Sequence, residues 1–207
     1  MVKSIKDDIL SWSKQIVEKH NPHIDFPTCP YAQQCRIKQT FKVEETDSLD
    51  RAYELVNEWI TKLNKTKYKI VVIGCSDYQD ISPDELSKVI EALNFISLPK
   101  NVYLMANHPD TSGDVDFLYS DNFETDNEFL MILIQRLDEL QEASARLKRV
   151  GYYKKWDQEY YEDTVGYRNK LIERISSMRG MKKKANKKNG KPNNKNNKKN
   201  VKKNSKK

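Results

Sequence analysis

The segment KYKIVVIGC, residues 67–75, constrains the fold more than any other part of the chain. Its centre is a continuous run of mostly β-branched residues that ends at Gly74. Such a run is typical of a strand that is buried on both faces, because a half-solvated strand alternates apolar and polar residues. A strand buried on both faces needs packing elements above and below its sheet. The segment therefore predicts an α/β layer structure built around this strand.

Helical patterns stand on both sides of this strand in the sequence. Residues 49–63 repeat apolar side chains at helical spacing, and Ser82, Pro83 and Glu85 form the start of a second helix with a capping box. Further elements are expected, in chain order, as a helix over 4–20, strands over 36–45 and 101–107, and helices over 126–148 and 153–178.

This order predicts a small three-stranded sheet flanked by helices, with parallel strands joined by right-handed crossovers. Three strands make a thin sheet, so a four-stranded, ferredoxin-like arrangement with an unrecognised strand stays open. The segment VDFLY, residues 115–119, is where that strand could lie. We expect an α/β globular domain over 1–150, an aromatic-rich C-terminal helix over 151–180 and a disordered tail over 181–207.

Charge is divided unevenly along the chain. Residues 182–207 contain thirteen lysines and no acid, so residues 1–181 carry a net charge of −6 although the whole chain carries +7. This tail has too little apolar surface to fold and is expected to attract nucleic acid or another polyanion without specificity. The polyanion-binding residues we expect are Lys182, Lys183, Lys184, Lys187, Lys188, Lys198, Lys199, Lys202 and Lys203.

The composition also bears on location and on bound groups. No run of eighteen apolar residues is present, and the first residues lack the apolar stretch of a secretory signal, so we expect no membrane span and a cytoplasmic protein. With three cysteines, structural disulfides are not expected in a reducing compartment. Neither of the common Gly-rich phosphate loops occurs, and we expect no cofactor and no metal.

The carboxyl ends of the second and third predicted strands hold one candidate active site. If those strands are parallel neighbours, Cys75, Asp77, His108 and Asp110 come together, because open α/β sheets carry their functional residues at this edge. Cys75 would be the nucleophile and His108 the general base, oriented by an acid such as Asp110. The alternative is that Asp, Ser and Pro at these positions only form turns.

The segment TCPYAQQC, residues 28–35, holds a second candidate, the thiol of Cys29. It resembles the start of a thioredoxin-type CPYC motif without the second cysteine, and reactivity would need a helix N-terminus or a nearby cation. The alternatives are a turn with a packed cysteine, which we favour, and a zinc site formed with His20, His23 and Cys35. Cys29 precedes the first predicted strand, so it should lie away from His108.

Two short motifs resemble a family of uncharacterised bacterial proteins. The family pattern has a tryptophan-bearing first helix, a Cys-Pro-Phe-Ala segment and a strand that ends in Phe-His-Pro-Asp. Trp12, the segment 29–32 (CPYA) and the segment 107–110 (NHPD) occupy the corresponding places here. The resemblance spans about residues 8–147, lacks the later Asn-Arg-Ser-Pro-Tyr-Pro stretch of the family, and implies a shared fold without an assigned activity.

The helix expected over 153–178 carries an aromatic and aliphatic stripe. Its members are Tyr153, Trp156, Tyr160, Tyr167, Leu171, Ile175 and Met178. Such a stripe packs against the rest of the chain, or against a second copy in a homo-oligomer. The sequence as a whole predicts an accessory or binding protein that contacts a polyanion, with a small Cys/His/Asp enzyme as the alternative.

Overall fold

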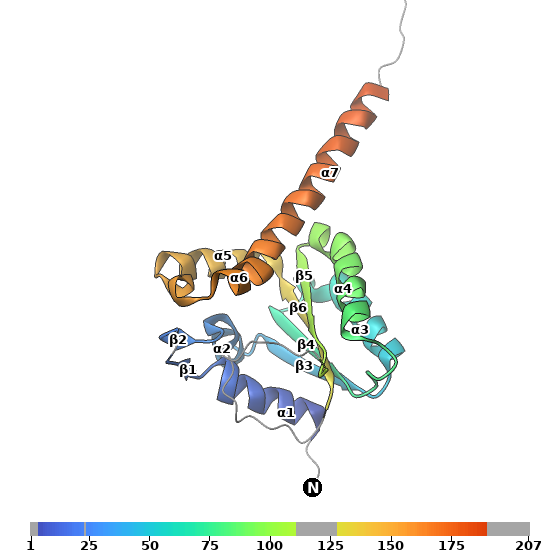
Figure 1. Ribbon diagram of the computed structural model, residues 1–207. Coiled ribbons are helices and arrows are strands. Elements are labelled where there is room, and N and C mark those ends of the chain that lie inside the picture. Colours follow the sequence, from blue (N-terminus) through green and yellow to red (C-terminus); the bar gives the residue numbers. More distant parts are fainter. Residues whose placement is uncertain (1–3, 23, 111–127, 190–207) are drawn as a thin grey trace, which may run out of the picture.

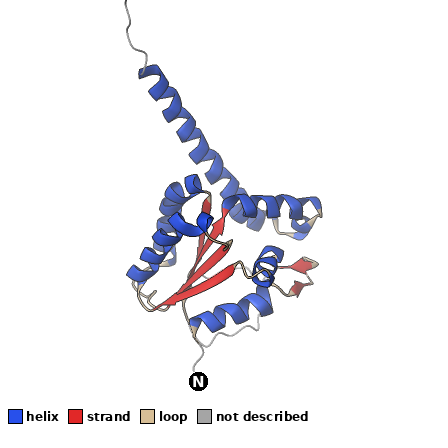
Figure 2. Cartoon of the chain, turned by 180° about the vertical axis from the view of Figure 1, so that it is seen from behind, coloured by secondary structure: helices blue, strands red, loops and turns tan. Residues whose placement is uncertain are grey.

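The computed structural model describes residues 4–22, 24–110 and 128–189, and it has an α/β architecture with helices on both faces of a sheet (Figures 1 and 2). In the described residues this sheet has the strand order β3 (Phe41–Thr46), β4 (Ile70–Cys75), β6 (Leu130–Arg136) and β5 (Val102–Asn107). β3 and β4 are parallel, whereas β6 is antiparallel to both of its neighbours. The predicted α/β class is confirmed; the sheet has the four strands that were left open as the alternative to three, and it is mixed rather than parallel.

Strand β4 lies at the centre of the packing, as its sequence predicts. All of its residues are buried. Val71 and Ile73 pack beneath α3 (Leu49–Lys62) and α4 (Pro83–Ser97), while Ile70 and Val72 pack against α1 (Ile5–Trp12), α2 (Pro30–Ile37) and α5 (Leu137–Arg149). These assignments give the two apolar layers that the run of β-branched residues requires.

Helix α1 packs directly over Gly74 of β4. A Cβ at this position would lie 2.4 Å from Cγ2 of Ile5 and 2.8 Å from Cδ1 of Ile9. The glycine is therefore required by the packing of the helix against β4.

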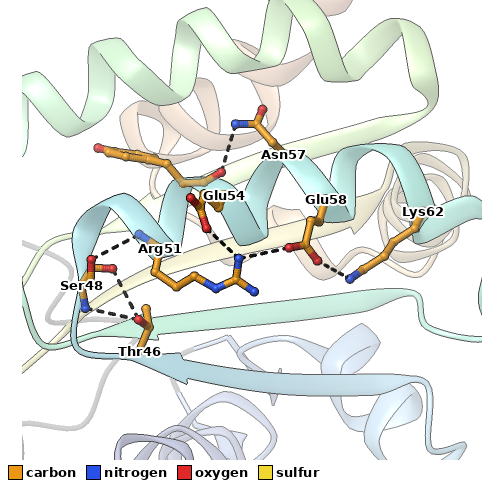
Figure 3. Close-up of polar contacts among 8 residues, drawn as sticks. Thr46, Ser48, Arg51, Glu54, Asn57, Glu58 and Lys62 are labelled. Carbon is orange, nitrogen blue, oxygen red and sulfur yellow. Dashed lines mark hydrogen bonds and ion pairs between the residues drawn. The ribbon is translucent and has the colours of Figure 1, made fainter.

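The predicted helix starts are confirmed for α3 and α4. The Ser82 side chain accepts from the backbone N–H of Glu85, and the Glu85 side chain accepts from that of Ser82, which completes the capping box. In α3 the Ser48 hydroxyl accepts from the backbone N–H of Arg51, whose guanidinium pairs with Glu54 and Glu58 on the exposed face (Figure 3).

The helix predicted over 126–148 is wrong in its first half. β6 occupies Leu130–Arg136, and α5 begins directly at Leu137. The first backbone N–H groups of α5 are capped from another part of the chain, because Asn101 accepts from Leu137 with its carbonyl and from Asp138 with its side chain. No local capping residue marks the boundary, and the apolar run of β6 continues the helical spacing of α5. Residues 115–119, suggested for a fourth strand, lie outside the described residues.

The strand predicted over 36–45 is confirmed only from Phe41 onward, and the turn predicted for TCPYAQQC is wrong. Residues Pro30–Ile37 form helix α2, with Pro30 in the first turn, and the strand begins only at Phe41. Tyr31 and Cys35 are buried one helical turn apart, whereas Ile37 is 66% exposed and does not share a face with the strand. This helix has only eight residues. Its apolar spacing was hard to recognise because the segment contains two cysteines and is followed by an alternating, β-like pattern.

The remaining elements are short or C-terminal. The described chain also contains η1 (Ser13–Val17), β1 (His20–Asn21), β2 (Phe26–Pro27), η2 (Leu63–Lys65), η3 (Leu98–Lys100), η4 (Tyr152–Lys155), α6 (Gln158–Tyr161), η5 (Glu162–Gly166) and α7 (Tyr167–Asn189). The single helix predicted over 153–178 is thus divided, and its last part continues into the lysine-rich segment as far as Asn189. Residues 190–207 lie outside the described part. Within the described ranges, no helix combines the length and apolar character needed to cross a membrane.

Candidate functional site

The sheet places the ends of β4 and β5 at the same edge but does not make them neighbours. Cys75 pairs with Leu130 and Asn107 pairs with Met131, so β6 separates the two strands. β4 and β5 run in the same direction, as predicted, because both are antiparallel to β6. The predicted contact between neighbouring strand ends is wrong, since two strand spacings place the backbones about 10 Å apart.

Cys75 is fully buried in the layer beneath α3 and α4. Its thiol donates to the carbonyl oxygen of Asp77 over 3.4 Å, and burial raises the pKa of the thiol. A nucleophilic cysteine needs a lowered pKa and an accessible sulfur. This geometry is that of a packed, protonated cysteine.

His108 is buried, and both of its ring nitrogens have partners. Nδ1 accepts from the backbone N–H of Asp110 over 3.1 Å, and Nε2 lies 3.3 Å from the carbonyl oxygen of Tyr78. This pairing fits a ring hydrogen on Nε2 that points to the Tyr78 carbonyl. The ring also packs edge-on against the Tyr78 ring, with 5.4 Å between the two ring centroids, so His108 joins the loops after β4 and β5. Because both ring nitrogens have partners, neither is free to take a proton from a substrate.

Asp110 and Tyr78 complete this arrangement. The Asp110 carboxylate is 70% exposed and lies 3.8 Å from Nδ1 of His108, so it faces solvent beside the ring. Tyr78, which the sequence reasoning did not single out, donates its hydroxyl to Glu128, and this hydrogen bond raises the pKa of Tyr78 to about 12. No local signal marks Tyr78, because its role depends on the loop that holds His108.

A small cavity of about 220 Å³ lies beside His108, between the start of α4 and the end of β5. Its polar lining comes from Asp84, Ser87, Asn107 and His108. Pockets that enclose a drug-sized ligand measure roughly 300–1,000 Å³. The cavity is smaller than this and holds no pair of groups arranged for nucleophilic attack, so the carboxyl edge gives little support to the predicted enzyme.

Cys29 lies in the opposite layer from His108, as predicted. It is the N-cap residue of α2 and packs in the cluster that contains α1 and the other face of the sheet. The helix N-terminus would favour a thiolate, and backbone hydrogen bonds from Ala32 and Tyr31 act in that direction. Burial has the larger effect and raises the pKa of the Cys29 thiol. Cys29 thus has the position at a helix N-terminus that a reactive thiol needs, but its apolar surroundings disfavour the thiolate.

Of the residues weighed for zinc, the described ones, His20, Cys29 and Cys35, are not grouped as a metal site. Nε2 of His20 lies 3.2 Å from Oδ1 of Asp25, at hydrogen-bond distance, and Cys35 is buried on the inner face of α2. His23 lies outside the described residues. Among the residues described, no group of three or more His, Cys, Asp or Glu side chains is placed to hold a metal.

We expect all three thiols to react slowly in the native protein. Burial raises the pKa of each, so a thiol reagent at about pH 7 should label Cys29, Cys35 and Cys75 far more slowly than a free thiol of pKa about 8.5. The rates should become equal once the chain is unfolded in guanidinium, which is the control. Rapid labelling of Cys29 in the folded protein at about pH 6 would instead show an activated thiolate.

The aromatic stripe of the C-terminal region packs mainly within the chain. Tyr153, Trp156 and Tyr160 cluster with Tyr152 and with the buried Ile24. Further along, Leu171 and Ile175 pack against Leu98, Tyr103 and Leu137. The stripe is thus used to attach α7 to the body, and a homo-oligomer through this region stays a prediction.

Comparison of the chain with protein-family models, with curated proteins and with solved structures found no match. The resemblance to bacterial proteins drawn from the CPYA and NHPD segments therefore stays a prediction.

Proposed function

We propose that this protein binds nucleic acid without sequence preference through the lysine-rich segment that begins at Lys182. The observation that carries the proposal is the continuity of α7, a single helix from Tyr167 to Asn189. Its first part is anchored by Leu171 and Ile175, and Figure 1 draws its second part standing away from the body. The first lysines of the segment are therefore carried away from a body whose net charge is −6.

The chemistry of the segment fits phosphate rather than base recognition. It has thirteen lysines but no arginine and no aromatic residue, so it lacks stacking groups, and its lysines and asparagines could read base edges only if a fold held them in a groove. Lysines that neutralise phosphates release condensed counterions, which makes the affinity fall steeply as salt rises. Non-specific, salt-dependent binding follows from this composition.

We expect a variant with all lysines of 182–207 changed to glutamine to lose binding to a mixed-sequence DNA duplex and to single-stranded RNA. Glutamine has nearly the helix propensity of lysine, so α7 should be kept. The matched control changes the same lysines to arginine and should bind with an unchanged salt slope. Fluorescence anisotropy across a salt series measures both. Full affinity in the glutamine variant would refute the proposal, as would preferential binding of the native chain to anionic lipid vesicles.

A further inference from the structure

Four exposed lysines lie at the end of the sheet where the parallel strands β3, β4 and β5 begin. We call them the basic rim: Lys38 follows α2, Lys65 and Lys67 precede β4, and Lys100 ends η3. The string KLNKTKYK, residues 62–69, contains Lys65 and Lys67 and is the local sequence signal of this edge. These lysines belong to three separate segments that the fold brings together.

Backbone and side-chain hydrogen bonds join those segments. The Asn64 side chain donates to the carbonyl oxygen of Lys100 over 2.6 Å, which ties the loop before β4 to η3. The backbone N–H of Lys69 donates to the carbonyl oxygen of Thr40 over 2.8 Å, which ties the same loop to the chain before β3. The rim is thus one continuous edge of the body.

Arg136 holds the central loop of this edge from beneath. Its guanidinium donates to the carbonyl oxygen of Leu63 over 3.3 Å and to that of Thr66. The segment that presents Lys65 and Lys67 is therefore fixed to the end of β6. A fixed backbone lowers the entropy lost when the lysines contact a ligand.

The rim lysines differ from their neighbours in having no acidic partner. Within the described ranges no residue forms an ion pair with them, whereas the adjacent Lys42, Lys62 and Lys69 pair with Glu44, Glu58 and Glu139 (Figure 3 shows the Lys62 pair). Acids gather at the opposite end of the sheet, where the loops after β3, β4 and β5 and the start of α4 carry Asp47, Asp77, Asp80, Asp84, Glu85 and Asp110. The end where β3, β4 and β5 begin also holds Asp138 and Glu139 at the start of α5, with Glu139 paired to Lys69, so basic side chains outnumber the acids there while acids predominate at the opposite end.

Helix α7 passes the basic end as it leaves the body. Ile175 packs on Leu98, which belongs to the same short helix as Lys100. At 1.5 Å per residue, Lys182 lies about 10 Å further along α7 than Ile175. Double-stranded DNA carries one phosphate charge per roughly 1.7 Å of its axis, so several phosphates fit within such a span.

We propose that the basic rim is a second contact surface for nucleic acid, and that one nucleic acid strand or duplex is bound by the rim and by the lysine-rich segment together. This inference rests on the proposed function and adds to it a defined surface on the folded body. The rim supplies fixed charges, while the segment beyond Lys182 supplies a larger number of them. The acidic end of the sheet repels the same ligand, which orients the body toward it.

The test uses the full chain with Lys65, Lys67 and Lys100 changed to glutamine. Its matched control changes Lys19, Lys88 and Lys148, which are also exposed and have no ion-pair partner among the described residues, so both variants lose the same charge. With a mixed-sequence DNA duplex, we expect the rim variant to bind about tenfold more weakly at moderate salt. The slope of log affinity against log salt should fall by about 2–3, because each lost phosphate contact removes about 0.9. The control should change the slope by less than about 1.

The outcomes separate the two proposals. If the rim and control variants weaken binding equally, the rim is not a contact surface, and the proposal of binding through the lysine-rich segment still stands. A rim effect without any effect of the tail glutamine variant would refute the proposed function and keep the rim. Rim-dependent binding to anionic vesicles, with no change in duplex binding, would overturn the inference.

Discussion

Replacing Asn94 with leucine is expected to lower the free energy of unfolding by roughly 2–6 kcal/mol, because two buried backbone groups lose their partner at about 1–3 kcal/mol each. Asn94 is 1% exposed on α4. Its side-chain amide donates to the carbonyl oxygen of Leu104, and its side-chain oxygen accepts from the Leu104 backbone N–H, both over 2.9 Å. β5 lies at the edge of the sheet, so Asn94 supplies the contacts of a neighbouring strand.

Denaturant unfolding of the Asn94→Leu variant measures this effect. The control is Asn57→Leu, which removes another helical asparagine whose side chain donates only to the Tyr53 carbonyl on the exposed face of α3 (Figure 3). That change should lower the free energy of unfolding by less than about 0.5 kcal/mol, as surface substitutions usually do. Similar losses in the two variants would mean that the contacts with Leu104 contribute little.

The second large effect is expected for Arg36→Gln. This change should lower the free energy of unfolding by an amount at the lower end of the roughly 3–5 kcal/mol that is typical of breaking a buried ion pair. The Glu18 side chain is 3% exposed, and Arg36 contacts it through Nε and a terminal nitrogen over 2.6–2.8 Å. Ser13 donates a further hydrogen bond to Glu18. In the variant, the buried Glu18 carboxylate keeps the hydrogen bond from Ser13 but loses those from the guanidinium. Because Arg36 is a third exposed, part of the loss is recovered by water.

This loss should depend on pH in a defined direction. Burial alone would raise the pKa of Glu18, but the hydrogen bonds from Arg36 and Ser13 outweigh it and hold the pKa below its ordinary value. The stabilisation is therefore complete above the unfolded pKa, about 4.3, and is lost as the pH falls through the lower folded value. The difference between native chain and variant should shrink below about pH 4.

Chemical unfolding at about pH 7 and at about pH 3.5 checks this prediction. Arg51→Gln is the matched control, because Arg51 pairs with Glu54 and Glu58 on an exposed helix face and should cost less than about 1 kcal/mol at either pH. A small loss would show that the pair does not stabilise the fold, and a loss that is equal at both values of pH would show that it does not arise from the charge of Glu18.

Local sequence signals were sufficient to predict the elements that have a clear apolar pattern or contain their own capping residues. β4 is marked by its run of β-branched residues, and α4 by the box of Ser82 and Glu85. β6 could not be separated from α5, because the groups that end the strand and cap the helix come from Asn101 in another part of the chain. Boundaries set by distant residues are not visible in local spacing.

The same distinction applies to the candidate site. The sequence placed Cys75 and His108 at one edge of the sheet, and the structure agrees. The predicted approach of their side chains was wrong, because local patterns did not reveal that another strand, β6, lies between β4 and β5. The basic rim was missed for a related reason, since Lys38, Lys65 and Lys100 are separated in sequence and meet only through the strand order.

The position of β6 between β4 and β5 has a consequence for biosynthesis. β4 finds its antiparallel partner about sixty residues later in the chain, and β5 has no partner in the sheet until the same strand arrives. A nascent polypeptide that has emerged only as far as β5 therefore presents unpaired edges of two apolar strands to solvent or to chaperones. Such edges favour aggregation, so ribosome-bound intermediates of this length should be the most dependent on protection.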